Sequence, residues 1–338
     1  MSVFPRCVVL ISIVLSGALG CSSSDAESGG SGGNGGLGGV GGSGGAEDPF
    51  YIPPDPLPSE VPGTLIRSGE IQPFSEGTKA WRVLYVSTDY ERLGTPGVHP
   101  YLVGPSEGRG VLDIVKAAQQ IEETGAGSRV VIWGRSQGGH GALFAGEIAP
   151  TWAPNLDVYG VISAAPASEF KAIIQSGVFL PGARGFIWQL AIGFEAAYAE
   201  LSIADVFTGD ALVAIETLFE DDACGAEFGE VASGFDNAGF ENNPLDLPAW
   251  VTRLDENSPG NIPTEVPVWL IQGEDDMVVP ILLTNVLAER LCDIGNEVEY
   301  EVFPGFGHDD STRMNMTDMI AWTADRFAGE PAATTCAE

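Results

Sequence analysis

A serine lies between glycines directly after a short apolar run, in the stretch "VVIWGRSQGGHG" at 130–141. Gly134, Ser136 and Gly138 fit the pattern G-x-S-x-G, with strand-forming residues before it and a helix-like sequence after it. A strand–turn–helix of this kind raises the serine hydroxyl at the carboxyl edge of a sheet, where the first helical N–H can bind an oxyanion. Ser136 is therefore the candidate nucleophile and the N–H of Gln137 the candidate oxyanion donor. A plain tight turn is the alternative.

A serine nucleophile needs a base, and the chain contains three histidines. His308 lies in the glycine-rich stretch "PGFGHDD", after the last predicted strand and before the last predicted helix, so it is the candidate base. His140 lies one turn past Ser136 on the same predicted helix, and we expect it to be structural. His99 lies in a proline-flanked loop and is predicted to be a packing or polar-network residue.

The acid that orients the histidine should lie between serine and histidine in the chain. The stretch "IQGEDDMVVP" at 271–280 follows a predicted strand and offers Glu274, Asp275 and Asp276. The spacing G-x-x-D-x-x-V-P selects Asp276, with Asp275 as the second choice. A solvated acidic turn without a chemical role is the remaining alternative.

Alternating strands and helices must position these residues. The predicted helices cover 109–123, the residues that follow Ser136, and 312–327. The predicted strands cover 80–88, 129–133, 158–166, 266–272 and 297–303. This alternation predicts an α/β fold with a parallel sheet. Residues 167–262 contain helical patches and no buried strand, which indicates an insertion into the α/β frame.

The N-terminal part of the chain is not expected to belong to the fold. Residues 1–20 are typical of a secretory signal, because Arg6 is their only charge and the apolar core is too short for a permanent membrane span. Cys21 lies where a bacterial lipoprotein would be cut and lipidated, and plain cleavage is the alternative. Residues 21–62 are expected to be a disordered tether rich in glycine, serine and proline, so the folded part should start near residue 63.

Charge and cysteine content narrow the class further. The formal net charge is −32, from 47 acidic and 15 basic residues, and no basic cluster exists. Nucleic acid is therefore excluded as an expected partner, because phosphate binding needs Lys and Arg. Cys224, Cys292 and Cys336 follow Cys21, and in an oxidising compartment they suggest one disulfide and one leftover thiol. A monomer is expected.

Several stretches resemble a known family: "STDYERLGTPGVHPYLVG", "GRSQGGHGAL", "PAWVTRLDENSPGN" and "QGEDDMVVP". They are similar to the bacterial and fungal secretory lipases, relatives of fungal lipase A. The resemblance implies an α/β-hydrolase with a mostly parallel sheet, whose core comprises residues 63–166 and 263–338, and a helical cap at 167–262. It also implies hydrolysis of carboxylic esters, often acylglycerols, without metal or organic cofactor. The cap segment "GVFLPGARGFIWQLAIGF" would shape an acyl tunnel or be ordinary cap core.

One part of the family pattern is missing. The strand "AWRVLYVSTD" runs directly into "YERLGTPG", and only 50 residues separate Val86 from Ser136. About 60–75 residues of the pattern are absent near residue 89, more than the ~30 of one βαβ unit. The absent part would hold an oxyanion donor and a cysteine, which leaves Cys292 to pair with Cys336 and Cys224 alone. We expect one side of the sheet to be truncated, with residues 82–88 shifting sideways to fill the vacant place.

These observations favour a secreted, lipid-anchored serine ester hydrolase of the bacterial cell envelope, acting on ester or lipid substrates through Ser136, His308 and Asp276. One rival is a catalytically impaired lipoprotein of the same fold that binds apolar ligands. Another is a peptidase or acyltransferase with the same triad, because a fold does not fix its chemistry.

Overall fold

The computed structural model describes residues 7–13, 83–93, 96–179, 183–220, 223, 225–310 and 316–337. The lipidation candidate Cys21, the expected tether at 21–62, the expected start of the fold near 63 and Cys224 lie outside the described residues.

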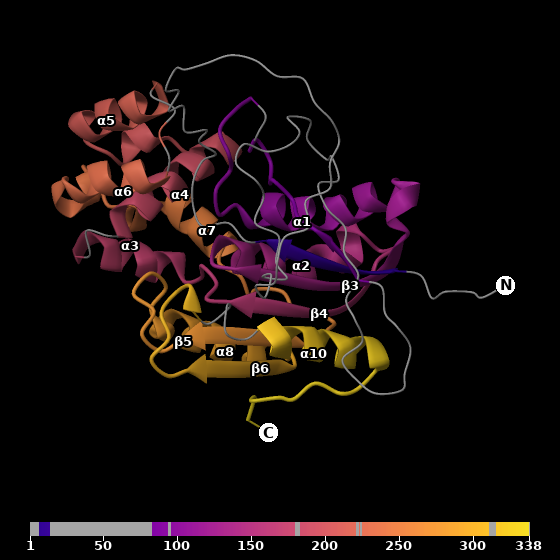
Figure 1. Ribbon diagram of the computed structural model, residues 1–338. Coiled ribbons are helices and arrows are strands. Elements are labelled where there is room, and N and C mark those ends of the chain that lie inside the picture. Colours follow the sequence, from indigo (N-terminus) through magenta and orange to yellow (C-terminus); the bar gives the residue numbers. More distant parts are fainter. Residues whose placement is uncertain are drawn as a thin grey trace, which may run out of the picture.

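Six parallel strands form one sheet in the order β2-β1-β3-β4-β5-β6 (Figure 1). The strands are β1 (Cys7–Ile13), β2 (Val83–Val86), β3 (Ala126–Arg135), β4 (Asp157–Ala164), β5 (Val268–Gly273) and β6 (Val298–Phe303). The predicted α/β class with a parallel sheet is confirmed. Because all neighbours are parallel, the carboxyl ends of β3, β5 and β6 meet at one edge of the sheet.

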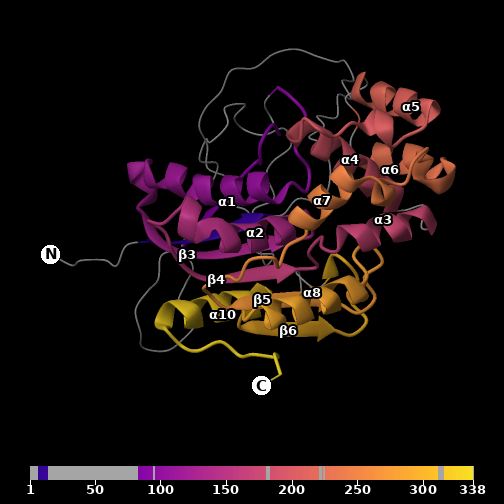
Figure 2. The ribbon, with the colours of Figure 1, turned by 180° about the vertical axis from the view of Figure 1, so that it is seen from behind.

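Helices cover both faces of the sheet, which explains why the central strands are continuously apolar. Val130 and Ile132 of β3 pack with α1 (Gly104–Gln119), α2 (Gln137–Trp152) and α8 (Ile281–Asp293). Val131 and Trp133, which alternate with them, pack with α10 (Met316–Ala328) on the opposite face. Figures 1 and 2 show α10 and α8 on opposite sides of β5 and β6.

Two helices differ from the sequence-based expectation. Helix α1 begins at Gly104, five residues before the predicted start at 109, because Pro105 suits a first helical turn and the side chain of Glu107 is buried rather than solvated. It ends at Gln119, and a 3-10 turn at Glu122–Thr124 follows. Helix α8 was not predicted, although its buried Leu287 and Leu291 are one helical turn apart.

Helices inserted between β4 and β5 form a separate layer, called the cap here. Its α-helices are α3 (Phe170–Phe179), α4 (Arg184–Ala197), α5 (Gly209–Glu220), α6 (Gly225–Ser233) and α7 (Pro248–Glu256), with 3-10 turns at Ile203–Asp205, Asp236–Gly239 and Pro244–Asp246. The cap has its own core, which includes the fully buried Trp188, Phe194, Phe207 and Phe228. Trp188 and Phe194 come from the apolar cap segment, so much of that segment is cap core.

Buried polar contacts tie both ends of the cap to the hydrolase core. Arg290 on α8 forms an ion pair with Glu169, where the cap begins, and donates to the carbonyl of Pro259, where it ends, at 2.8 Å. Glu147 on α2 accepts the N–H of Gly260 at 2.6 Å, and burial raises the pKa of this carboxyl to about 7. The cap is thus anchored at its entry and its exit.

The predicted disulfide is confirmed. Cys292 at the end of α8 is bonded to Cys336, with a Cα–Cα distance of 5.5 Å. Because Cys336 follows α10, the bond fastens the C-terminal tail to the edge of the sheet near β6. Within the described residues, no helix is long and apolar enough to cross a membrane.

Strand β1 comes from the apolar run that was predicted to be a signal. Its backbone pairs with β2 from Val8 to Ile11 and with β3 from Cys7 to Ile13. The expectation that residues 82–88 would fill this place is wrong, since Val83–Val86 pairs outside β1 and ends the described sheet with four residues. The β-branched run "CVVLISI" suits a strand with neighbours on both sides. The same residues cannot be both a leader that is cut off and a strand that stays in the sheet.

We expect a chain that lacks residues 1–20 to unfold at lower urea concentration than the full chain. Without β1, the backbone groups of β2 and β3 lose their ladder partners, at about 1 kcal/mol for each hydrogen bond. The full chain with Val9→Pro and Ile11→Pro is the matched control, because proline removes ladder donors without shortening the chain. Superimposable urea curves for the full, shortened and proline-substituted chains would contradict a structural role of β1.

Candidate active site

Ser136 lies in a sharp turn between β3 and α2. Its backbone has φ 57° and ψ −121°, a region that non-glycine residues rarely occupy. Its N–H donates to Ala164 O at 2.9 Å, which fixes the turn to the end of β4. A Cβ at Gly134 would lie 1.9 Å from the carbonyl oxygen of Gly138, so the chain can make this turn only with glycine there. The predicted strand–turn–helix is confirmed, and the Ser136 side chain is partly exposed.

The carboxylate of Asp276 meets the imidazole of His308 at the same sheet edge. His308 Nδ1 lies 2.7 Å from Asp276 Oδ2. The other oxygen, Oδ1, accepts the N–H groups of Val278 and Val279, both at 2.8 Å, and Gln272 donates to Oδ2 at 3.1 Å. Because the carboxylate can only accept, His308 donates from Nδ1, and Nε2 is left as the acceptor. Asp276 is 3% exposed, whereas Asp275 is exposed, so the choice of Asp276 over Asp275 agrees with the structure.

An ion pair connects the serine turn to the histidine loop. Arg135 immediately precedes Ser136, and Asp309 immediately follows His308. Arg135 Nη1 lies 2.5 Å from Asp309 Oδ1, and the arginine side chain is only 7% exposed. The contact spans 174 residues of sequence and brings the two candidate loops together. No direct hydrogen bond joins Ser136 Oγ to His308 in the described part of the chain, as is common before a substrate binds.

Helix α2 begins directly after Ser136, so its first N–H groups lie next to the candidate nucleophile. Gln137 is the first residue of this helix, and its N–H has no partner within the helix because no residue precedes it by a full turn. The partial positive charge at a helix N-terminus favours a negative charge there. The N–H of Gln137 therefore stays the predicted oxyanion donor.

A second buried carboxylate–histidine pair lies beneath the serine turn. Glu107 on α1 is fully buried and contacts His140 Nδ1 at 2.6 Å, while its Oε1 accepts Gln137 Nε2 at 2.8 Å. His140 Nε2 lies 2.9 Å from the carbonyl oxygen of Asn257, so both ring nitrogens are engaged. As predicted, His140 is structural. His99 also lies in a polar network, between Glu91 O at 2.8 Å and Gln137 Nε2 at 2.9 Å.

Sequence reasoning missed Glu107, Asn257 and the Arg135–Asp309 pair. Glu107 could have been found by extending the predicted helix toward its N-terminus, because it lies four and eight residues before Val111 and Val115, which are buried on the apolar face of α1. The roles of Asn257 and of the Arg135–Asp309 pair depend on contacts across 117 and 174 residues of chain, respectively. No local sequence pattern indicates contacts at that distance.

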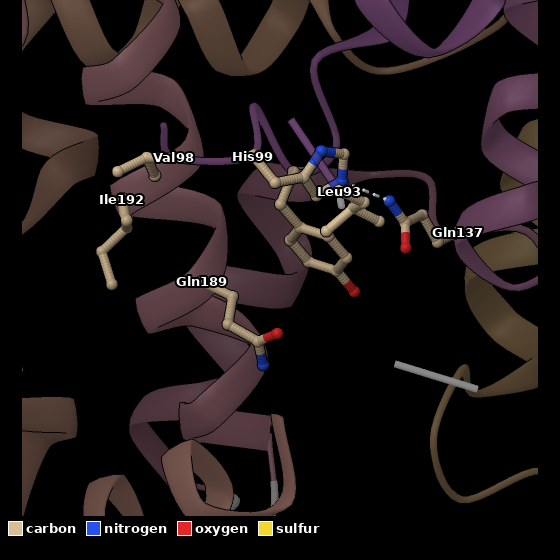
Figure 3. Close-up of a pocket in the computed structure, with 7 residues that line it drawn as sticks. Leu93, Val98, His99, Gln137, Gln189 and Ile192 are labelled. Carbon is tan, nitrogen blue, oxygen red and sulfur yellow. Dashed lines mark hydrogen bonds between the residues drawn. The ribbon is translucent and has the colours of Figure 1, made fainter. Parts of the chain in front are cut away.

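A small pocket adjoins Gln137 between the core and the cap. It is lined by Leu93, Val98, His99, Tyr101, Gln137, Gln189 and Ile192, and its cavity volume is about 20 Å³, room for about one water molecule. Figure 3 shows Gln189 extending from the cap helix α4 toward the side where Gln137 lies, while Ile192 lies further along the same helix, near Val98. Two residues of the apolar cap segment therefore reach a pocket, while most of the segment packs in the cap core. Among the described residues, no cluster of three or more His, Cys, Asp or Glu could hold a metal ion.

We expect His140→Ala to lower the free energy of unfolding by about 3–5 kcal/mol, because it leaves the buried Glu107 carboxylate without its partner. Urea unfolding followed by circular dichroism measures the change. In the double variant Glu107→Gln with His140→Ala, the loss should be smaller than the sum of the two single losses. Additive losses would contradict a coupled pair.

Several curated lipases and esterases are similar to this chain. The chain is 25% identical to a secreted triacylglycerol lipase of Malassezia globosa over 80% of this chain and 63% of that one. It is 27% identical to a probable trichothecene esterase of Stachybotrys chartarum (60% and 43%) and 24% identical to a probable inactive lipase of Mycobacterium tuberculosis (65% and 51%). The chain thus spans about half the length of the curated relatives it matches.

Solved structures show the same architecture. Candida antarctica lipase A superposes with a TM-score of 0.66 at 17% identity, covering 76% of this chain and 61% of that chain. This likeness establishes the α/β-hydrolase fold. The sequence model of the secretory lipases matches residues 76–209 and 251–335, which include Ser136, Asp276 and His308. The chain belongs to the secretory lipase family.

Proposed function

We propose that the protein is a secreted serine hydrolase of carboxylic esters, with Ser136 as nucleophile, His308 as base and Asp276 as orienting acid. The observation that carries the proposal is the Asp276–His308 hydrogen bond at the sheet edge where the strained Ser136 turn also lies. Family membership supports ester hydrolysis as the class of reaction.

In this mechanism the Ser136 hydroxyl attacks the ester carbonyl while His308 Nε2 takes its proton. Asp276 keeps Nδ1 protonated and stabilises the imidazolium that forms. The N–H of Gln137 binds the oxygen that becomes negative. His308 then protonates the leaving alcohol. In the second half of the reaction His308 takes a proton from the water that attacks the acyl-enzyme and returns it to the oxygen of Ser136.

Acylglycerols are the proposed substrates, in line with the triacylglycerol lipase among the relatives. An exposed apolar patch next to the triad supports contact with apolar substrate. Met277 and Val278 directly follow Asp276 and are 87% and 45% exposed, and Leu282 and Val286 on one side of α8 are 66% and 40% exposed. Apolar residues scattered singly over a surface need no explanation, but four within ten residues form a patch.

A second candidate is a hydrolase-fold protein with impaired catalysis that binds apolar ligands. Two observations favour it: the family segment absent near residue 89, which would supply an oxyanion donor, and the probable inactive lipase among the relatives. Loss of one oxyanion donor costs about 10²–10³ in rate. A peptidase or acyltransferase would use the same triad and is distinguished by substrate alone.

We expect Ser136→Ala and His308→Ala each to lower kcat/KM for nitrophenyl esters by at least about 10³-fold. The urea midpoint of unfolding should stay unchanged. The measurement is a panel from acetate to palmitate, with a peptide as control and glycerol as competing acceptor. If kcat of the unmodified chain is about 10²–10³-fold lower than that of a full-length secretory lipase, this would support the second candidate, a hydrolase-fold protein with impaired catalysis. An organophosphate adduct on a residue other than Ser136 would refute the nucleophile.

We expect Arg135→Gln and Asp309→Asn each to lower kcat by about 10-fold to 100-fold with little change in KM, because a misplaced histidine loop slows proton transfer rather than binding. The double variant should lose no more than either single variant. Arg135→Lys should retain part of the activity. The matched control is Lys171→Gln, which breaks the exposed Lys171–Asp255 pair on the cap. Equal effects of control and test variants would contradict the positioning role.

We further propose that the leader is cut before Cys21 and that this cysteine carries lipid, which would anchor the protein to a bacterial membrane. The short apolar core and the glycine-rich sequence behind Cys21 support this. Mass spectrometry of the mature N-terminus should give a lipid-modified Cys21, with the protein in the membrane fraction. A mature chain that keeps Cys7–Ile13 would contradict the anchor and leave β1 in the sheet.

A further inference from the structure

The peptide unit between Ser136 and Gln137 carries the predicted oxyanion donor, and its carbonyl end is fixed. Because a trans peptide is planar, the direction of the Gln137 N–H follows from the direction of the Ser136 C=O. Ser136 O accepts the N–H of His140 at 3.1 Å and the N–H of Ala167 at 3.3 Å. His140 belongs to α2, whereas Ala167 lies in the segment that leads from β4 into the cap. The donor is thus held from the cap side as well as by its own helix.

The side chain of Gln137 is fixed by a buried carboxylate. Gln137 is 4% exposed, and its Nε2 donates to Glu107 Oε1 at 2.8 Å and to His99 Nε2 at 2.9 Å. Glu107 is fully buried, and Oε1 also accepts the N–H of Leu102 at 3.0 Å. Its other oxygen lies 2.6 Å from His140 Nδ1. A rotation of the Gln137 side chain would break these buried hydrogen bonds without replacing them, which is unfavourable.

Asn257 connects this network to the cap. It directly follows α7 and is fully buried. Its carbonyl oxygen lies 2.9 Å from His140 Nε2, and its side-chain Oδ1 accepts the N–H of Gly104, the first residue of α1, at 2.8 Å. One residue of the cap therefore holds both His140 and the helix that carries Glu107.

Two cap helices hold Asn257 in turn. Its Nδ2 donates to the hydroxyl of Tyr198, which follows α4, and to the carbonyl of Arg253 on α7, both at 2.8 Å. Helices α1 and α2 are closely packed beneath it, since a Cβ at Gly104 would lie 2.3 Å from Phe144 Cζ. A shift of Asn257 would therefore be passed on to α1 and α2 rather than absorbed by free space.

We propose that Asn257 is a positioning residue through which the cap orients the Ser136–Gln137 peptide, by way of His140 and Glu107. A displaced cap would slow acyl transfer without weakening substrate binding, because the donor acts on the charge that develops in the transition state. The inference rests on the proposed function, since it assigns a task to the Gln137 N–H. It gives the cap a part in the rate of the reaction, in addition to any contact with substrate.

The orientation of this peptide can be measured directly, because Ser136–Gln137 is the only Ser-Gln pair in the sequence. The full chain, labelled with ¹³C at serine carbonyls and ¹⁵N at glutamine, gives one HNCO cross-peak for it. We expect Asn257→Ala to move this peak and Tyr198→Phe, which keeps the ring packing, to move it less. Asn261→Ala is the matched control and should leave it in place, since Asn261 is exposed and bonds to two nearby carbonyls. A peak that stays in both test variants, or moves equally in the control, would overturn the proposal.

Kinetics measure the consequence for the rate. We expect kcat for nitrophenyl acetate to fall about 10-fold in Asn257→Ala and about 2-fold in Tyr198→Phe, because complete loss of one donor costs about 10²–10³. KM should change by less than about 2-fold in both. The inhibition constant of butylboronic acid, which adds to Ser136 Oγ and mimics the tetrahedral intermediate, should rise by the factor by which kcat/KM falls. A higher KM with unchanged kcat would indicate a substrate contact and overturn the proposal.

The position of the cross-peak does not depend on turnover, so it separates this inference from the proposed function. If no form of the chain hydrolyses any ester but Asn257→Ala still moves the peak, the proposed function is refuted and the coupling between cap and peptide stands. If the unmodified chain is active and Asn257→Ala moves the peak without lowering kcat, the effect on the rate is overturned and the proposed function stands. Circular dichroism of each variant confirms that it is folded.

Discussion

The strained turn at Ser136 depends on the parallel sheet that holds it. Its positive φ is unfavourable for a serine and persists because neighbouring strands fix both sides of the turn. Ser136 N–H donates to the end of β4, Ala165 N–H donates to Ile271 O of β5, and Glu274 N–H donates to Phe303 O of β6. These bonds pass along the carboxyl edge from β3 to β6. The three candidate residues are therefore placed by one continuous backbone network.

Two buried carboxylate–histidine pairs flank this turn, and their remaining hydrogen bonds decide what each can do. In the Glu107–His140 pair, the second ring nitrogen is bound to Asn257 O, so the imidazole has no free acceptor and links α1, α2 and the cap. In the Asp276–His308 pair, no hydrogen bond to the second nitrogen is found among the described residues, and the histidine side chain is 13% exposed. The same two residue types thus stabilise the structure on one side and can transfer a proton on the other.

Much of this arrangement could be predicted from the sequence, because its signals are local. The G-x-S-x-G turn, the loop before the last helix and the G-x-x-D-x-x-V-P spacing each lie at the end of a strand with a clear apolar run. The start of α1 was missed because Glu107 interrupts the apolar pattern, and its partners His140 and Gln137 are distant in sequence. The Arg135–Asp309 pair was missed for the same reason, since charge attraction between two loops leaves no periodic pattern.

The vacant place in the sheet is the point where local signals conflict with the whole fold. A strand is needed between β2 and β3, because a buried parallel strand without a neighbour would leave N–H and C=O groups unpaired. The apolar run Cys7–Ile13 meets that need, since a leader core and a central strand share the same composition. Ladder pairing can be restored by any apolar strand, whereas an oxyanion donor needs one particular loop geometry. A strand such as β1 can therefore restore the stability of the sheet, but it cannot supply an oxyanion donor to the candidate active site.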